Sequence, residues 1–267
     1  MVWTIAMIEV GSLPGTALGA YVYGALDEAL LDVPCFCWLL RDDRHVVLVD
    51  TGPDLAQSVG VGYEVGGEPR ADLLAALRVC GVAPADVGLI VHTHLHQDHV
   101  QNDELFPAAT VLVQRRELEA ALAGDAACAR LSDAERGALA AGLYADSQAA
   151  GVWYRGIGAL TGALGRRLQT VVGEREVLPG IVAVPNGGHT PGHQSVVVTT
   201  ADGAVCLCGD IVSLSINRDV VGPMTPDEEA TRAFLRRLRT ERWEVVPAHE
   251  PGLRAHPWLV RAETAVV

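Results

Sequence analysis

Four side chains that can bind a divalent metal ion lie within one short segment, His94-Leu95-His96-Gln97-Asp98-His99. The segment follows the apolar run 87–91, whose residues are typical of a buried β-strand. Core packing does not require three imidazoles and a carboxylate at the exit of such a strand. Histidine nitrogen and aspartate oxygen are, however, regular ligands of zinc. The segment therefore predicts a metal site.

The spacing of these side chains indicates the local structure that carries them. Positions 94, 96 and 98 cannot share one face of a helix, because two residues turn a helix by about 200°. In an extended segment the same positions project to one side. We therefore expect a loop at the end of a strand. A lone tetrahedral zinc takes three protein ligands and a water. This segment alone offers four ligands, so the count suggests two metal ions.

Further candidate ligands follow other predicted strands. His189 and His193 lie in a glycine-rich turn after the predicted strand 181–184, whereas Asp210 and His249 each follow a short apolar run. Proteins of the α/β class build active sites from several strand ends along one edge of a sheet. We therefore expect these residues to converge with the first segment.

Strands and helices are predicted to alternate along the chain. A helix is predicted over 70–80, another from Ser132 with Glu135 at its third position, and a third after Thr225, which is expected to cap it. This order predicts sheets with helices on their outer faces. The segments rich in β-branched or aromatic residues, each predicted to be a strand, are 2–10, 35–40, 45–49, 87–91, 110–113, 181–184, 195–200, 204–208 and 243–246.

Length and charge limit the classes of function. The 267 residues are 49 % apolar and carry no linker-like tract, so we expect one domain over 1–267. The net charge of −13 argues against nucleic acid as a partner. All 20 basic residues are arginine, which excludes a Schiff-base lysine. The N-terminal region reads neither as a signal peptide nor as a membrane span, so we expect a cytoplasmic protein without a membrane partner.

The six cysteines show no C-x-x-C pair of the kind found in zinc ribbons. We expect reduced thiols, as is usual in the cytosol. Cys35 and Cys37 are two residues apart, as are Cys206 and Cys208, so each pair is expected to point to one face of a strand. We interpret both pairs as core residues and not as metal ligands.

From about Val47 to His249 the motifs resemble those of the metallo-β-lactamase superfamily, in the same order. The resemblance implies an α/β fold, an αββα four-layer sandwich, with a two-metal site at the edge of its sheets. It is carried by Asp50-Thr51-Gly52, His94-x-His96-x-Asp98-His99, Gly188-His189-Thr190-Pro191-Gly192-His193, Gly209-Asp210 and His249.

The resemblance also implies a ligand set. Asp210 would bridge the two metals, while Asp50 and His193 would support the ligands without binding metal. Zinc is favoured over manganese or iron, although the last two also fit such donors. The first metal would be held by His94, His96 and His189, and the second by Asp98, His99 and His249.

Within the superfamily the chain looks most like the N-acyl homoserine lactonases. That likeness implies a hydrolase that opens a lactone or cleaves a related carboxylic ester of a small molecule carrying an acyl or aromatic group. A hydroxide bridging two divalent ions would attack the carbonyl, since zinc lowers the pKa of bound water to about 7. Asp98 would orient the hydroxide and pass its proton to the leaving group.

One position departs from the lactonase pattern. Those enzymes commonly have a tyrosine three residues after the bridging aspartate, where it contacts the substrate carbonyl. Here that position is Ser213. Either Tyr154, Tyr144 or Tyr23 serves from another loop, or the substrate differs.

The region at about 115–169 is longer than a minimal sandwich needs. We interpret it as a helical insert, for which two roles stay open. It forms a lid with an apolar lining for the substrate, or it packs on the sheet as ordinary helices or as the contact of a homodimer. The loop from Gly19 to Val33, with Tyr21 and Tyr23, is a candidate for another wall of the pocket.

Three other functions remain as alternatives. A thioesterase acting on an acyl or polyketide-like thioester would use the same metals. An oxidoreductase of this fold with mononuclear iron, such as a persulfide dioxygenase, would bind one iron per chain. A metal-binding module would turn over neither lactones nor thioesters.

Overall fold

The computed structural model describes residues 2–26, 28–55, 64–140 and 144–260. A six-stranded sheet has the order β1-β2-β3-β4-β5-β6, antiparallel from β1 to β3 and parallel from β3 to β6. Its strands are β1 (Thr4–Ala17), β2 (Leu30–Arg41), β3 (Val46–Val49), β4 (Leu89–Val91), β5 (Thr110–Gln114) and β6 (Leu168–Val171).

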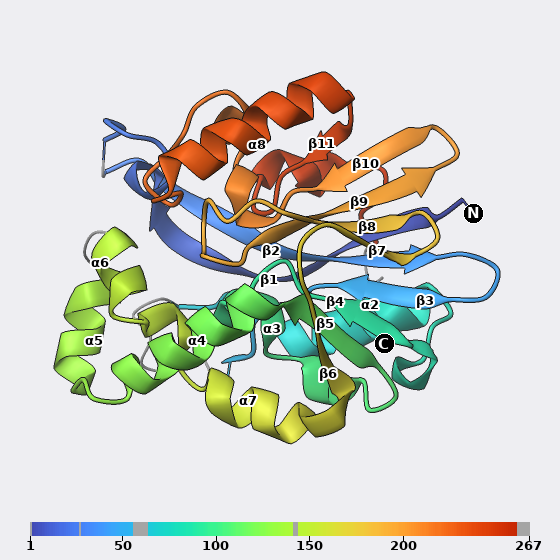
Figure 1. Cartoon of the computed structure of the whole chain (residues 1–267), viewed down its shortest axis with the longest axis horizontal. Helices are drawn as coiled ribbons and strands as arrows, with labels where there is room; N and C mark the ends of the chain where they lie inside the picture. The colour runs from blue at the N-terminus through green and yellow to red at the C-terminus, as the bar shows by residue number, and fades with distance from the viewer. Residues whose placement is uncertain (1, 27, 56–63, 141–143, 261–267) are drawn as a thin grey trace, which may run out of the picture.

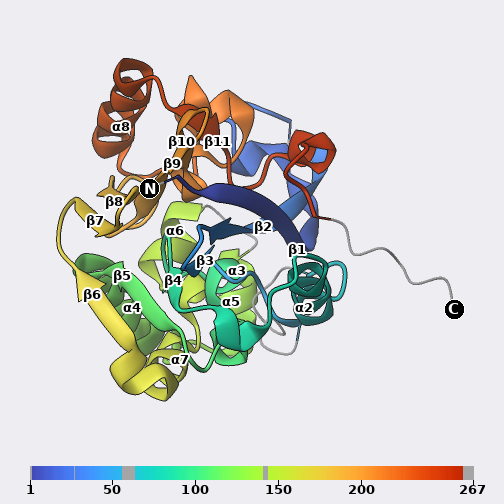
Figure 2. The same cartoon turned by 90° about the vertical axis from the view of Figure 1, so that its right-hand side faces the viewer.

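A second sheet of five strands faces the first, as Figures 1 and 2 show. Its order is β11-β10-β9-β8-β7, antiparallel except for the parallel pair β10 and β11. The strands are β7 (Arg175–Leu178), β8 (Ile181–Pro185), β9 (Gln194–Thr200), β10 (Gly203–Leu207) and β11 (Glu244–Val246).

Helices cover the outer face of each sheet. Leu73 and Leu77 of α2 and Leu164 of α7 pack on the first sheet, and α8 packs on the second. A third apolar cluster fills the space between the sheets. The four layers form the predicted αββα sandwich (Figure 1). The helices are α2 (Pro69–Val79), α3 (Gln97–Val100), α4 (Arg115–Cys128), α5 (Asp133–Ala140), α6 (Tyr144–Ala149), α7 (Ile157–Leu164) and α8 (Glu228–Glu241).

Strand β2 shows why the central strands read as continuous apolar runs. Phe36 and Trp38 point into the core between the sheets, whereas Cys37 and Leu39 point into the core under α2. Side chains alternate between the two faces of a strand, and helices and the second sheet bury both. A strand buried on both faces needs apolar residues at every position.

Each strand predicted from the sequence overlaps an observed strand. The strands β6 and β7 were not predicted, and β1 and β2 are longer than predicted. The strands β6 and β7 have four residues each, too few to show a period. The first strand was predicted over 2–10, yet β1 runs to Ala17 and includes Pro14. As an edge strand, β1 tolerates a proline that donates no hydrogen bond to a neighbour.

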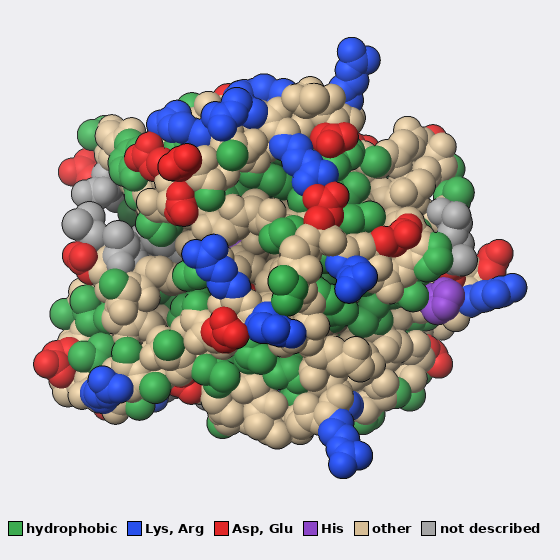
Figure 3. Space-filling view, in the orientation of Figure 1, with side chains coloured by type: hydrophobic (Ala, Val, Ile, Leu, Met, Phe, Trp, Pro, Cys, Tyr) green, Lys and Arg blue, Asp and Glu red, His purple; other side chains and the backbone are tan. Residues whose placement is uncertain are grey.

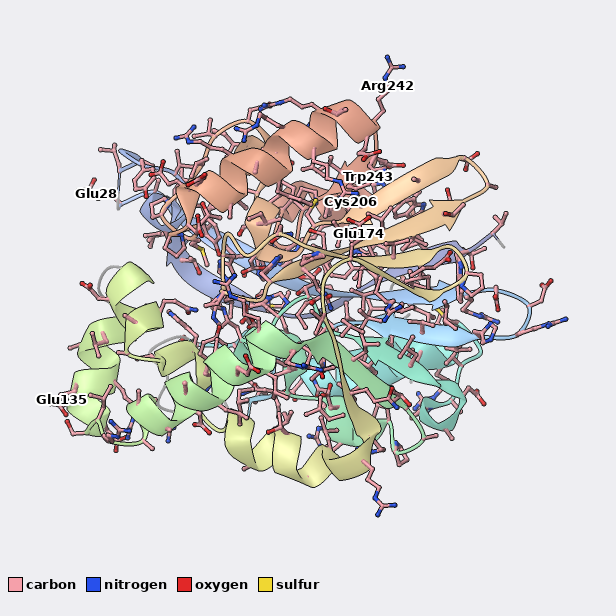
Figure 4. The ribbon with its side chains drawn as sticks, in the orientation of Figure 1. Glu28, Glu135, Glu174, Cys206, Arg242 and Trp243 are labelled. Atoms are coloured by element: carbon pink, nitrogen blue, oxygen red, sulfur yellow. The ribbon has the colours of Figure 1, made fainter. Side chains whose placement is uncertain are left out.

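The start of α8 corrects one prediction. Its N-cap is Asp227, whose carboxylate accepts a hydrogen bond from the Ala230 amide (3.0 Å), and not Thr225. Thr225 instead donates its hydroxyl to the Gly222 carbonyl, so it stabilises the preceding turn. Figure 4 shows Cys206 and Trp243 beneath this helix, while Arg242 at its end points away.

The described residues 115–140 and 144–167 contain the helices α4 to α7, with one 3-10 turn between α6 and α7 (Val152–Tyr154) and another after α7 (Gly165–Arg167). The predicted start at Ser132 is confirmed, because Ser132 and Glu135 exchange hydrogen bonds in a capping box. Tyr154 and Ile157 from this region pack in one apolar cluster with Leu95 of the histidine segment. The helical region is thus joined to the loop that carries the candidate ligands.

Charges of both signs are interspersed over the face seen in Figure 3. Arg237 shows how they pair, since it donates two hydrogen bonds to Glu174 and lies over the Trp243 ring. None of the helices in the described part of the chain has the length and apolar character that a membrane crossing requires.

Candidate metal centre

The proposed ligands all stand at the ends of strands. His94 and His96 follow β4, and the short helix α3 begins directly after His96, which places Asp98 and His99 in its first turn. The other three follow strands of the second sheet. His189 lies in the turn after β8, Asp210 in a 3-10 turn (Gly209–Val212) after β10, and His249 after β11.

The structure brings these seven side chains together. For description we divide them into a first group, His94, His96 and His189, and a second group, Asp98, His99 and His249, with Asp210 between; ligand atoms of His94, His99 and Asp210 also lie within 4.8 Å of one another. In the first group, ligand atoms of His94, His96 and His189 lie within 4.8 Å of one another. His96 Nδ1 is 3.1 Å from His189 Nε2. All three side chains are buried.

The second group has nearly the dimensions of a tetrahedral zinc site. His99 Nε2 lies 3.5 Å from Asp98 Oδ2 and 3.3 Å from Asp210 Oδ1. His249 Nε2 lies 3.7 Å from Asp98 Oδ2 and 3.1 Å from Asp210 Oδ1. Around a tetrahedral zinc with bonds of about 2.1 Å, neighbouring ligand atoms are about 3.4 Å apart. The four atoms therefore need little rearrangement to surround one ion.

Asp210 connects the two groups. Its Oδ1 faces His99 and His249, while its Oδ2 lies 3.5 Å from His189 Nε2. The side chain is 2 % exposed. A carboxylate whose two oxygens face different ligand groups is placed to bridge two adjacent cations.

Hydrogen bonds on the outer side of each histidine fix which nitrogen faces inward. In the first group, the His189 ring donates Nδ1–H to the Met224 carbonyl, and the His96 ring donates Nε2–H to Gln148 Oε1 (2.9 Å). The remaining nitrogens then face each other as lone pairs, which repel unless a cation lies between them. His94 donates Nδ1–H to Thr93 Oγ1 (3.0 Å), which directs His94 Nε2 inward.

The histidines of the second group follow the same rule. His99 donates Nδ1–H to Asp50 Oδ2 (2.8 Å), and His249 donates Nδ1–H to the Pro34 carbonyl (2.8 Å). Their Nε2 atoms therefore face the carboxylates of Asp98 and Asp210. Metal-binding histidines are usually held by such a bond from the other ring nitrogen.

The electrostatics of the two groups differ. Burial, reinforced by neighbouring imidazoles, lowers the pKa of His94 and His96 well below the usual value. Burial also opposes charge on His99 and His249, but the nearby carboxylates, Asp210 among them, raise the pKa of both imidazoles well above the usual value. The carboxylates thus attract positive charge to the second group. A metal that binds there displaces the protons they hold.

The donor set fits divalent metal ions. Among the described residues, His94 Nε2, His99 Nε2 and Asp210 Oδ1 are buried without a hydrogen-bond partner. Orphaned polar atoms are costly in a folded protein unless an ion or water satisfies them. Three such atoms in one cluster of nitrogen and oxygen donors favour a bound cation.

Removal of metal is expected to lower the melting temperature by at least about 10 °C, because an ion bound at a thousand times its Kd stabilises the fold by about 4 kcal/mol. Thermal unfolding of the full chain with and without a chelator measures this. Zinc added back should restore the original melting temperature, whereas magnesium, which prefers all-oxygen sites, should not. An unchanged melting temperature after verified metal loss would contradict the fit.

Asp50 and His193 lie beside the proposed ligands and form hydrogen bonds with them or with their loops. Asp50 accepts hydrogen bonds from His99 and from both the amide and hydroxyl of Thr93 (2.8 Å each). It adopts a positive φ of 58°, a strained conformation for a residue other than glycine. His193 donates Nδ1–H to Asn186 and accepts the Asp210 amide on Nε2 (3.0 Å). It therefore positions Asp210, in addition to supporting its own turn.

The hydroxyl groups that were candidates for contacting the substrate carbonyl differ in their hydrogen bonds and in their exposure. Ser213 donates to the Asp210 carbonyl (3.1 Å), so its hydroxyl braces the backbone of that turn. The Tyr154 phenol donates to Glu117 and accepts from Gln148 (3.2 Å each). Tyr23 is 57 % exposed. The side chain of Tyr144 lies outside the described residues.

Sequence analysis overlooked the role of Glu117. This fully buried carboxylate accepts the Leu95 amide (3.0 Å), the Gly192 amide (3.0 Å) and the Thr190 hydroxyl (2.7 Å), as well as Tyr154. It thereby joins the two histidine loops to the helical region. A glutamate at the start of an exposed-looking helix carries no local sign of this role.

The surroundings of two further side chains, Cys35 and Tyr21, could not be predicted from the sequence. Cys35 was interpreted as a core residue, yet its Sγ lies within 4.8 Å of the ligand atoms of Asp98 and His249. Burial raises the pKa of this thiol to about 11. Tyr21 is buried, and burial together with the carboxylates of Asp210 and Asp98 raises the pKa of its phenol well above the usual value.

A surface cleft reaches the metal centre between α4, α6 and the His189 turn. His189 and Gln148 line it, so it meets the first ligand group. The α4 side of the cleft carries small side chains, among them Ala120, Ala123 and Gly124, and the charged side chain of Arg116. Small apolar residues leave room for an apolar group beside the candidate ligands.

Two comparisons of the sequence with known proteins bear on function. Residues 30–249 match the family model described as "Metallo-beta-lactamase superfamily". An N-acyl homoserine lactonase of Bacillus sp is 28 % identical over 234 residues, which cover 83 % of this chain and 80 % of that protein.

Two solved structures share the fold. An N-acyl homoserine lactone hydrolase with N-hexanoyl-L-homoserine at its catalytic metal center superimposes with a TM-score of 0.73, at 21 % identity, over 95 % of this chain and 96 % of that one. AidC, a dizinc quorum-quenching lactonase, superimposes with a TM-score of 0.66, at 16 % identity, over 93 % and 88 %.

Proposed function

The chain belongs to the metallo-β-lactamase superfamily, and we propose that within it the protein is a dinuclear-metal hydrolase that opens a lactone or cleaves a related carboxylic ester. The observation that carries this proposal is Asp210, whose two oxygens face two separate groups of ligand atoms. The similarity to a Bacillus N-acyl homoserine lactonase supports the choice of substrate class. If the site held a single metal ion at the first group, the second group, Asp98, His99 and His249, would have no ion to bind.

In this proposal the residues divide into two metal positions. His94, His96 and His189 hold the first ion, and Asp98, His99 and His249 hold the second. Asp210 contacts both. Zinc suits this mixture of imidazole and carboxylate ligands, although manganese or iron could replace it. Metal ions in these positions would supply an activated water at neutral pH and polarise the substrate carbonyl.

Asp98 is proposed to move the proton. Its side chain is 13 % exposed, whereas that of Asp210 is 2 % exposed, so Asp98 is the more accessible carboxylate of the second group. Its Oδ2 faces His99 and His249, which leaves the other oxygen to accept a proton from the attacking water. The same oxygen then gives that proton to the departing alkoxide as the ester C–O bond breaks.

The cleft between α4 and the His189 turn is proposed to receive the acyl group. It leads to the first ligand group, and apart from Arg116 its α4 side presents small side chains such as Ala120, Ala123 and Gly124. The helical region 115–169 then forms one side of the substrate site. This assigns that region a lining role, while its contacts through Glu117 and Tyr154 also hold the ligand loops.

Tyr21 is proposed to replace the tyrosine that is absent at Ser213. Burial, together with the carboxylates of Asp210 and Asp98, raises the pKa of its phenol, so the phenol keeps its proton and can serve as a hydrogen-bond donor to the substrate carbonyl. Tyr21→Phe is expected to lower kcat/KM by about 100-fold, the usual cost of losing one such donor. Metal content should not change. Steady-state kinetics and metal analysis measure both effects.

Tyr23→Phe is the matched control, because that side chain is 57 % exposed. It should behave as wild type, and Ser213→Ala should lose far less activity than Tyr21→Phe. Full activity of Tyr21→Phe, or a complete loss in Ser213→Ala, would reverse the assignment of the two hydroxyls.

The proposed function is tested by turnover of a substrate panel with the zinc-loaded protein. The panel contains acyl homoserine lactones, simple lactones, aryl esters and acyl thioesters. We expect two metal ions per chain and fastest turnover among the lactones. Preference for thioesters would change the substrate class, one iron per chain would indicate an oxidoreductase, and two metals without turnover would indicate a binding module.

A further inference from the structure

Cys35 differs from the other cysteines in what surrounds it. Cys37, Cys206 and Cys208 belong to the apolar clusters on the outer faces of the two sheets. The Cys35 thiol instead lies beside a carboxylate and an imidazole, within 4.8 Å of the ligand atoms of Asp98 and His249. This side chain is 1 % exposed. A thiol that only filled core volume would be expected among apolar neighbours.

The strand that carries Cys35 is tied to the second ligand group. The neighbouring residue, Pro34, accepts the Nδ1–H of His249 on its carbonyl (2.8 Å). Directly opposite, the pairing of β1 with β2 shifts register between Glu9 and Ser12. Such irregularities often re-aim side chains beside functional sites. Along β2, the side chains of Leu39 and Cys37 pack in the apolar core under α2. Cys35, two residues before Cys37, instead lies near the ligand atoms of Asp98 and His249.

An independent observation shows that this position favours a cation. Within the part of the chain that the structure describes, His99 Nε2 and Asp210 Oδ1 are buried without hydrogen-bond partners. Both atoms lie 3.1–3.5 Å from ligand atoms of Asp98 or His249, the two residues that Cys35 approaches. Cys35 Sγ therefore approaches two of the four donors that face one another here, and those two lie next to the unsatisfied atoms of His99 and Asp210.

We propose that Cys35 is a sulfur ligand of the metal held by Asp98, His99, His249 and Asp210. The inference rests on the proposed two-metal function and extends it. Zinc sites can expand to five ligands, and the zinc–sulfur bond of about 2.3 Å is longer than bonds to nitrogen or oxygen. The thiol proton leaves to solvent as the sulfur–metal bond forms, since a coordinating thiol is deprotonated.

A sulfur donor has a consequence for metal choice. Thiolate ligands favour zinc and cobalt over manganese and magnesium, which prefer oxygen. The second position is therefore expected to discriminate against manganese more strongly than the first position, whose ligands are three imidazoles and a shared carboxylate.

Cobalt substitution tests the proposal. Co²⁺ bound to a thiolate gives a sulfur-to-metal charge-transfer band in the near ultraviolet, which imidazole and carboxylate ligands do not produce. The full-length protein with two equivalents of Co²⁺ should show this band, and Cys35→Ser should lack it. The second equivalent should also bind at least about ten-fold more weakly to Cys35→Ser, because even indirect supports of a metal contribute that much.

Cys37→Ser is the matched control, since Cys37 is equally buried on the same strand but belongs to an apolar cluster. It should keep the band. Two bound cobalt ions with hydrolysis but no band in wild type would overturn the role of Cys35 and leave the proposed function standing. A band that persists in Cys35→Ser would also overturn it. Failure to bind any metal would overturn both.

Discussion

Asp210→Ala is expected to lower the metal content from two ions per chain to below one and to reduce kcat/KM at least about a thousand-fold. Loss of a residue that merely supports a ligand costs 10–100-fold, and Asp210 faces both ligand groups directly. Its removal also takes away a carboxylate that, together with Asp98 at His99, raises the pKa of His99 and His249. Metal analysis and steady-state kinetics on the same preparation measure the two losses.

Asp219→Ala is the control for this variant. Asp219 is a largely exposed aspartate whose salt bridge with Arg239 lies on the surface, where such pairs contribute little. It should retain two metals and full activity. Two tightly bound ions in Asp210→Ala would mean that the groups do not share this carboxylate, and the dinuclear assignment would be withdrawn.

Glu117→Gln is expected to destabilise the fold by about 3–5 kcal/mol, the usual cost of breaking a buried charged network. The carboxylate accepts four hydrogen bonds, from the Leu95 and Gly192 amides, the Thr190 hydroxyl and the Tyr154 phenol. An amide in its place turns one acceptor into a donor that faces other donors. The melting temperature should fall by about 10 °C.

The same substitution should weaken metal binding, because Glu117 connects the loops of His94 and His189. Thermal unfolding and a zinc titration of the folded variant measure the two effects separately. Glu119→Gln is the control, since Glu119 lies two residues further along α4 and is exposed. If Glu117→Gln unfolds at the wild-type temperature, the hydrogen bonds seen at this carboxylate do not hold the loops together.

The candidate metal centre could be proposed from sequence because its proposed ligands follow recognisable strands. An apolar run that ends in His94-x-His96-x-Asp98-His99 needs no tertiary information to be read as a strand followed by a metal-binding loop. His189, Asp210 and His249 could be added because parallel or adjacent strands end at the same edge of a sheet. The resemblance to a known superfamily supplied the order of the layers.

Other elements could not be read locally. The strands β6 and β7 are too short to show a period, and the cap of α8 was placed at Thr225 although Asp227 was better positioned. Propensity along the chain favours both residues as caps. Thr225 does not cap the helix because its hydroxyl donates a hydrogen bond to the Gly222 carbonyl in the preceding turn.

The sequence by itself determined which atoms can bind metal and that they stand at strand ends, since both follow from residue type and short spacing. The tertiary structure alone decided which atoms meet. Glu117 reaches Thr190 across 73 residues and His249 reaches Pro34 across 215, and Cys35 comes beside Asp98 through folding alone. Contacts between distant residues depend on how the sheets pack, and no local pattern encodes that packing.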